Sequence, residues 1–240
     1  MDPLERTLEA HGGRAAWQAA REIVARARSG GFALASRGRA RAFRACTVRV
    51  STAEPRAVIE PYGGGGRRGV FLGDRVRLET TAGALLAERR APRAAFAGWR
   101  RALWWDRLDA LYFGGYALWN YLTTPWLLVR PGVTVDEAGP WSEDGHAWQR
   151  LRVRFPPDVP THSREQVFYV DAAGLLRRHD YTAEVFGSWA TAAHYCHAHR
   201  RFDGLVLPTR RRVLPRARSG RRRPFPTLVW IDLDAVTVVR

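Results

Sequence analysis

The chain has 240 residues, 46% of them hydrophobic, so it is long enough to bury a full core and does not belong to the disordered class. Basic residues number 39 against 23 acidic ones, a net charge of +16, and every basic residue is arginine. An arginine-only excess is as typical of a coding bias as of a polyanion-binding protein. Cys46 and Cys196 are too few for a disulfide scaffold, and the first residues form no export signal, so we expect a cytoplasmic protein.

The N-terminal part of the chain changes its hydrophobic period once. Residues 1–20 have helical spacing, with a break at residues 11–13, where the sequence reads His-Gly-Gly. From residue 21 the period becomes two, which predicts strands within residues 21–90. Gly73 and Asp74 predict a tight hairpin turn between two of these strands.

The central block, residues 91–122, has a helical pattern and is rich in aromatic residues. The run from 110 to 129 carries no charged side chain and has about the length of a membrane span. Thr124-Pro125 interrupts it, because the residue before proline favours extended backbone. We therefore predict a buried or cavity-lining helix over residues 104–122, followed by a short strand from Trp126.

The last part, residues 126–240, returns to strands. Leu151, Val153 and Phe155 alternate with arginines, which places the apolar residues on the core face and the arginines in water. Asp203-Gly204 predicts a two-residue hairpin turn.

Together these segments predict one domain over residues 1–240 of the α+β class. It contains a large antiparallel sheet of about ten or eleven strands, and a sheet of that size curls. The N-terminal segment and the central aromatic block are the helices that cover its apolar face.

Several segments are similar to a known family. The opening with His-Gly-Gly at 11–13 and Trp17, the hairpin FYVDAAGLLRRHDY at 168–181 and the segment FDGLVLPTRRRVL at 202–214 resemble the lipoprotein-carrier-like (LolA-like) half-barrel superfamily. The segments PRAAFAG, YLTTP and THSREQ also resemble uncharacterised bacterial proteins of that architecture. The resemblance implies an open half-barrel wrapped around helices, with lipids or lipoproteins bound between them, and it assigns no residue a role.

The aromatic block is the strongest binding signal, because ligand pockets are mostly apolar with a few orienting polar groups. The leading hypothesis is therefore a soluble protein that binds a hydrophobic or amphipathic, lipid-like molecule between sheet and helices. It is more a binding protein than an enzyme, and we expect no cofactor. The candidate ligand-binding residues are Trp104, Trp105, Tyr112, Tyr116, Trp119, Tyr121 and Trp126.

An alternative is an enzyme of the cyclase, isomerase or hydrolase type, which acts without an organic cofactor on an apolar substrate in the same cavity. It requires at least two acid–base groups to converge there. The candidates are His162, His179, Asp180, Tyr181 and His194. We expect no metal site: in a strand His197 and His199 share one face, and zinc needs three or four ligands.

A further alternative is binding to an anionic surface through arginine clusters, with nucleic acid disfavoured because no nucleic-acid-binding fold signature accompanies them. The candidate arginines are Arg210, Arg211, Arg212, Arg221, Arg222 and Arg223.

Overall fold

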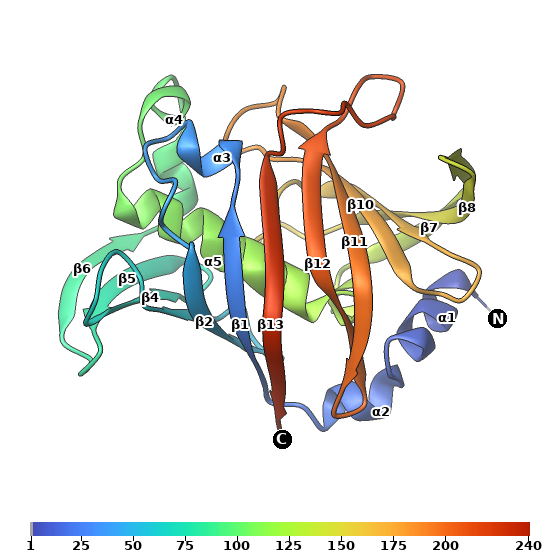
Figure 1. The fold of residues 1–240 in the computed structure, drawn as a ribbon, viewed down its shortest axis with the longest axis horizontal. Helices are drawn as coiled ribbons and strands as arrows, with labels where there is room; N and C mark the ends of the chain where they lie inside the picture. The colour runs from blue at the N-terminus through green and yellow to red at the C-terminus, as the bar shows by residue number, and fades with distance from the viewer. Residues whose placement is uncertain (1) are drawn as a thin grey trace.

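A computed structural model describes residues 2–240 of the chain. The strands are β1 (Glu22–Gly30), β2 (Ala45–Ser51), β3 (Ala57–Glu60), β4 (Arg67–Phe71), β5 (Arg75–Thr80), β6 (Leu85–Arg90), β7 (Thr134–Glu143), β8 (His146–Arg154), β9 (Glu165–Val170), β10 (Leu176–Thr182), β11 (Thr191–Phe202), β12 (Leu205–Pro215) and β13 (Val229–Val239). They form one sheet in the order β6-β5-β4-β3-β2-β1-β13-β12-β11-β10-β9-β8-β7. All neighbours are antiparallel, and the first and last strands pair at the centre of the sheet (Figure 1).

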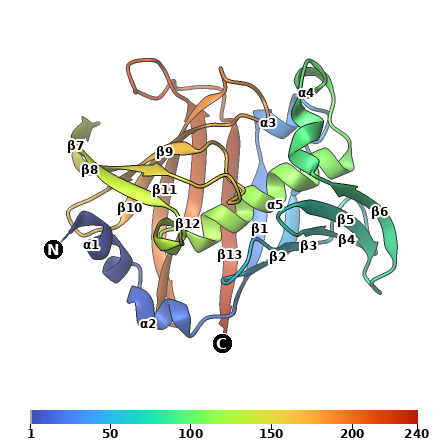
Figure 2. The ribbon, with the colours of Figure 1, turned by 180° about the vertical axis from the view of Figure 1, so that it is seen from behind.

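The helices are α1 (Pro3–Ala10), α2 (Gly13–Gln18), α3 (Phe32–Ala35), α4 (Arg100–Leu103) and α5 (Arg107–Thr123), with 3-10 turns η1 (Pro92–Phe96) and η2 (Trp126–Val129). The long central helix lies on the concave side of this curled sheet, as the view from behind shows, whereas α3 lies at its upper end (Figure 2). The long helix α5 crosses the hollow of the sheet, and α1 and α2 pack beside its lower end. The predicted α+β open half-barrel around N-terminal and central helices is confirmed.

Two strands extend the sheet beyond the predicted ten or eleven, and both lie at its edges. β6 pairs only with β5. Its neighbouring residues Leu85 and Leu86 are both exposed, so the strand lacks the inward–outward alternation that marks a half-buried strand. β7 pairs only with β8 and has a register shift between Glu137 and Pro140. Edge strands tolerate proline and irregular pairing, which is why periodicity did not reveal them.

The central helix and the segment after it differ from the prediction. The Asp106 side chain accepts from the Asp109 N–H (2.9 Å), and the Asp109 side chain accepts from the Asp106 N–H (3.0 Å). This capping box starts the helix at Arg107 rather than at 104. The predicted strand from Trp126 is wrong: the segment is a 3-10 turn whose apolar side chains are buried in the core, with the Trp126 ring stacked on Trp17 at 4.3 Å.

The uncharged run from 110 to 129 lies inside the protein. All of α5 from residue 109 to 123 is buried, as the sequence predicts for this run. Within residues 2–240, no helix has both the length and the apolar character needed to cross a membrane.

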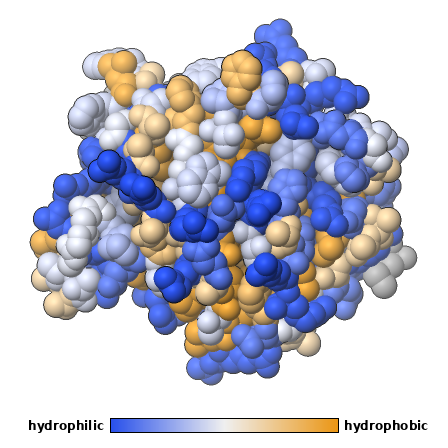
Figure 3. Space-filling model, viewed as in Figure 1, coloured by the Kyte–Doolittle hydropathy of each residue, from blue (hydrophilic) through white to orange (hydrophobic). Residues whose placement is uncertain are grey.

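The outer face of the sheet carries the alternating arginines. Leu151, Val153 and Phe155 are buried, whereas Arg152 and Arg154 are exposed, as the alternation predicts. In the space-filling view of the outer face, hydrophilic side chains spread over the central strands with hydrophobic surface between them (Figure 3).

Two glycines allow α5 to lie close to its neighbours. A Cβ on Gly115 would lie 2.5 Å from the Phe71 Cβ of β4, and a Cβ on Gly114 would overlap the Phe43 ring. Real side chains do not approach so closely, so these positions set the distance between helix and sheet.

Gly115→Ala should therefore destabilise the protein by about 1–3 kcal/mol, although alanine favours helix more than glycine does. Gly65→Ala is the control, because a Cβ there meets nothing within 4 Å. Denaturant unfolding measures both, and an unchanged or higher stability of Gly115→Ala would contradict the close fit.

His11 fastens the N-terminal helices to the sheet. Its Nδ1–H donates to the Val206 oxygen (2.7 Å), and its Nε2 accepts from the Leu176 N–H (3.2 Å). The side chain is fully buried, and burial lowers its pKa to about 4. Protonation of Nε2 would set a second N–H against the Leu176 N–H, so the neutral imidazole is the form that fits.

Between pH 6.5 and about 4 the unfolded chain binds a proton at His11 that the folded chain does not. The free energy of unfolding should therefore fall as the pH is lowered through this window, by up to about 3 kcal/mol from His11. His11→Gln should be less stable at pH 7.5 and should lose less on acidification, whereas exposed His146→Gln should keep the parent slope. Chemical denaturation at both pH values tests this, and equal slopes in His11→Gln and the parent would refute it.

Candidate functional site

An open cavity of about 850 Å³ lies at the end of the half-barrel that is uppermost in Figure 1. It is bounded by α3, by the loop 183–190 between β10 and β11, and by the loop 216–228 between β12 and β13. Its buried floor is formed by Phe113, His162, Tyr181, Ala192 and Val213. Its rim includes Phe32, Trp189, Arg218, Arg223 and Pro226.

Strand alternation explains the floor. Tyr181 of β10, Ala192 of β11 and Val213 of β12 are inward positions of three successive strands, and Phe113 of α5 faces them across the hollow. Alanine and valine at these positions leave space beside the larger aromatic rings. The small inward residues of β11 and β12 therefore account for the empty space that forms the cavity.

A hydrogen-bonded chain of four buried side chains ends at this floor. The hydroxyl of Tyr116 lies 3.1 Å from His162 Nδ1, and that of Tyr121 lies 2.7 Å from His162 Nε2. The Tyr121 and Tyr181 hydroxyls are 3.0 Å apart, and the Tyr181 ring stacks on the His162 imidazole at 3.9 Å. Of the four, His162 and Tyr181 border the cavity.

Burial keeps all four groups neutral. It lowers the pKa of His162 to about 3 and raises the pKa of the Tyr116, Tyr121 and Tyr181 hydroxyls. Four neutral groups carry four protons between them and share three hydrogen bonds, so one hydroxyl proton of the chain is not used within it. Depending on the direction of donation, Tyr181 presents either a hydroxyl donor or a lone pair to the cavity.

Two further histidines lie directly behind this chain. His179 is hydrogen-bonded to the Gln166 side chain and lies 5.8 Å from the His194 ring, and the Tyr121 ring meets His194 edge-on at 4.5 Å. Burial holds the pKa of both imidazoles well below the usual value. The structure thus brings His162, His179, Tyr181 and His194 close together, and of these four His162 and Tyr181 line the cavity.

Asp180, the fifth candidate acid–base residue, lies on the other face of β10. Its carboxylate accepts two hydrogen bonds from Arg178 (2.7 and 2.8 Å) and one from the Tyr169 hydroxyl (2.9 Å). Arg178 is fully buried and also donates to Glu143 (2.7 Å). Because neighbouring residues of a strand point to opposite faces, Asp180 cannot join the histidines.

The seven candidate ligand-binding aromatics fill the core rather than the cavity. Trp104 is the exception: it is 66% exposed, with the Arg39 guanidinium 5.7 Å from its ring. The six buried members are Trp105, Tyr112, Tyr116, Trp119, Tyr121 and Trp126. None of the seven lines the cavity, so their part in ligand binding stays a prediction.

Sequence reasoning missed several of the residues that do line the cavity. Phe186 and Trp189 lie in the loop 183–190, where the segment FGSW places two aromatic residues beside a glycine and a serine. Aromatic residues in such a loop were the available signal. Ala192 and Val213 gave none, because their sequence is that of any inward strand position.

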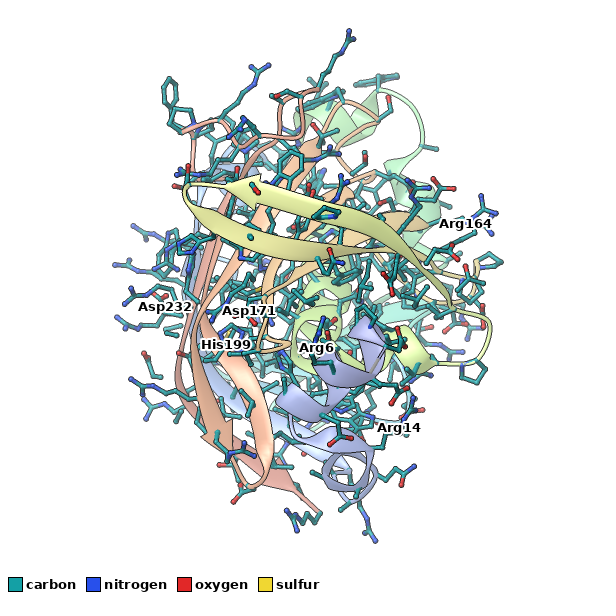
Figure 4. All side chains as sticks on the ribbon, turned by 90° about the vertical axis from the view of Figure 1, so that its right-hand side faces the viewer. Arg6, Arg14, Arg164, Asp171, His199 and Asp232 are labelled. Carbon is teal, nitrogen blue, oxygen red and sulfur yellow. The ribbon has the colours of Figure 1, made fainter. Side chains whose placement is uncertain are left out.

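The prediction that His197 and His199 share a face is wrong. Ala198 between them has a φ of +52°, which breaks the strand alternation. His197 stacks over Tyr195, whereas the His199 ring lies 5.6 Å from buried His11, near the N-terminal helices (Figure 4). Among residues 2–240, no three histidine, cysteine or acidic side chains gather as metal ligands would.

The six candidate arginines do not form one surface. Arg211 points inward and is buried, donating to the Tyr121 carbonyl oxygen and the Cys196 sulfur, so its predicted surface role is wrong. Arg212 pairs with Asp232 (2.8 Å), and Arg210 lies 4.0 Å from the same carboxylate. Arg222 pairs with Asp144 (2.8 Å), while Arg221 and Arg223 are exposed.

Comparison with solved structures establishes the fold. A LolA superfamily protein from Nitrosomonas europaea superposes with a TM-score of 0.54 at 11% identity, over 99% of this chain and 92% of that chain. A DUF1329 family protein from Desulfovibrio piger gives 0.55 at 13% identity, over 98% and 91%. The chain has a LolA-like fold. A Vibrio parahaemolyticus domain described as an outer membrane lipoprotein-sorting protein gives 0.53 at 10% identity, over 98% and 91%.

The resemblance noted in the sequence is therefore confirmed as a LolA-like fold. The sequence matches no protein-family model and no curated protein. Identities of 10–13% establish the fold alone, so no residue role is transferred from these structures.

The position of Asp180 predicts a structural effect. Asp180→Asn should lower the free energy of unfolding by about 3 kcal/mol, because it leaves the buried Arg178 guanidinium with one carboxylate fewer. Asp234→Asn, which breaks the exposed pair with Arg28, should have a much smaller effect, because water screens this pair. Urea denaturation compares the two variants, and equal losses would show that the Arg178 cluster contributes no more than a surface pair.

Proposed function

We propose that this chain binds a hydrophobic or amphipathic small molecule of lipid type in the cavity at the open end of the half-barrel. The observation that carries the proposal is the cavity itself. Its volume of about 850 Å³ lies within the range of ligand pockets, and its walls combine alanine, valine and aromatic side chains with a few polar groups.

The fold comparison supports the same class of ligand. One structure that shares the LolA-like fold is described as an outer membrane lipoprotein-sorting protein domain. A hydrophobic cargo fits the apolar floor around Phe113 and Val213, where burial of apolar surface would drive binding.

The convergence of buried histidines and tyrosines favours one second candidate. Tyr181 and His162 border the cavity and belong to a chain that can give or take a proton at the Tyr181 hydroxyl. This is the arrangement that an enzyme acting on an apolar substrate would need at its floor. The same cavity then serves catalysis instead of carriage.

Solvent extraction of the purified protein, followed by mass spectrometry, separates these candidates. A binding protein should yield a lipid-like molecule. That molecule should stay unchanged when it is incubated with folded, purified protein. Conversion of that molecule, abolished by Tyr181→Phe, would identify the enzyme instead. Recovery of no apolar molecule, together with failure to bind an apolar dye, would refute both.

Filling the cavity should weaken binding without weakening the fold. Ala192→Leu and Ala183→Leu place extra methyl groups into the cavity, so both should reduce the affinity for the neutral dye N-phenyl-1-naphthylamine by about tenfold or more. Ala40→Leu, at an exposed site outside the cavity, should leave the fluorescence titration unchanged. Thermal midpoints confirm folding, and parent-like dye binding by both folded cavity variants would place the ligand elsewhere.

A further inference from the structure

The rim of the cavity is strongly cationic. Four arginines contribute to the lining: Arg37, Arg216, Arg218 and Arg223. Among the described residues that line the cavity there is no aspartate and no glutamate. The apolar floor of the cavity therefore opens toward a positively charged rim.

The loop 216–228, which is closed by backbone hydrogen bonds, carries three of these arginines. The Ala217 N–H donates to the Arg221 oxygen (2.8 Å), and the Gly220 N–H donates to the Ala217 oxygen (3.0 Å). The Arg223 N–H donates to the Pro215 oxygen (2.8 Å), which closes the base of the loop. These bonds fix the backbone from which the arginine side chains extend, and a loop that is already formed reduces the ordering cost of binding.

The carboxylates near this loop are engaged by arginines other than Arg218 and Arg223. Asp144 pairs with Arg222, and Asp180 makes two short hydrogen bonds to Arg178 while lying 3.5 Å from Arg216. Arg218 and Arg223 take part in none of the ion pairs that the structure describes within residues 2–240. Their positive charge is therefore directed at solvent and at the cavity mouth.

Cationic and apolar surfaces meet at a defined level of the cavity. The Arg37 guanidinium lies 5.1 Å above the Phe186 ring, and both residues line the cavity between floor and rim. An apolar wall has a low dielectric constant, so it strengthens the attraction of the neighbouring arginines for an anion. Guanidinium groups also match carboxylates and phosphates in geometry, with two parallel hydrogen bonds.

We propose that the ligand is an amphiphile with an anionic head group, carboxylate or phosphate, held by Arg218 and Arg223 at the mouth while its chain occupies the apolar floor. This inference rests on the proposed function, because it specifies the ligand of the same cavity. The positive charge of the rim then binds the head group of the ligand, in addition to keeping the protein soluble.

Displacement of N-phenyl-1-naphthylamine tests the head group with matched probes. Dodecanoate and dodecyl phosphate carry the anion, and 1-dodecanol carries the same chain without charge. The anionic probes should displace the dye at concentrations about tenfold lower than dodecanol does, and this ratio should shrink as salt is raised. Acetate and inorganic phosphate, which lack the chain, should displace nothing at millimolar concentration.

The double variant Arg218→Gln/Arg223→Gln should bring the ratio of anionic to neutral probe close to one. Arg26→Gln/Arg200→Gln removes the same charge from exposed positions outside the cavity and should keep the parent ratio. All four side chains are exposed, so the variants should fold, and thermal midpoints confirm it.

Each outcome decides one proposal. Equal displacement by dodecanoate and dodecanol in the parent, or an unchanged ratio in the Arg218/Arg223 variant, would overturn the head-group inference and leave the hydrophobic cavity intact. Displacement by inorganic phosphate alone would show a free-anion site and would also overturn it. Failure of the dye and of every chain-bearing probe to bind would overturn the proposed function, and the head-group inference with it.

Discussion

The rest of the structure depends on the burial of α5 in the hollow of the sheet. A curled sheet leaves its concave face open to water unless another element fills it, and α5 is buried from residue 109 to 123. Such a helix needs no polar stripe, and its sequence has none. Gly114 and Gly115 allow the close approach, and the capping box at Asp106 and Asp109 sets where the helix begins. The cavity is the part of the hollow where small strand residues face the helix.

Burying α5 also buries polar groups, and the interior solves this by pairing them with each other. An unpartnered hydroxyl or imidazole would cost free energy in so dry a place, so the chain from Tyr116 through His162 and Tyr121 to Tyr181 is held by mutual hydrogen bonds. The same desolvation keeps its imidazole neutral. A polar patch consequently ends an otherwise apolar cavity, which suits a ligand with one polar atom at its inner end and equally suits proton transfer.

The arginines behind the net charge of +16 have three different physical roles in the folded chain. Over the outer face, arginines alternate with core residues and several pair with carboxylates, as Arg212 does with Asp232. Inside, Arg178 and Arg211 are buried and hold the strands to their neighbours through hydrogen bonds. At the cavity rim, a group of arginines lies beside apolar surface, and the described lining there holds no acidic residue. Position, rather than number, distinguishes a binding charge from a solvated one.

The sequence by itself determined the α+β class, the hairpin turns such as Asp203-Gly204 and the inward face of β8, because local periodicity and turn chemistry act within a few residues. It also named four residues that lie close together in the structure, His162, His179, Tyr181 and His194. Three of them are inward residues of the neighbouring strands β10 and β11, whereas His162 lies in the loop between β8 and β9. Strand alternation also places Asp180 on the face opposite His179. The sequence could not place the core-filling tryptophans or foresee the turn of His199 at Ala198. Those were decided by the tertiary structure. The space that stays empty beside α5 and the arginines around it come from segments far apart in the chain, so local sequence patterns do not reveal them.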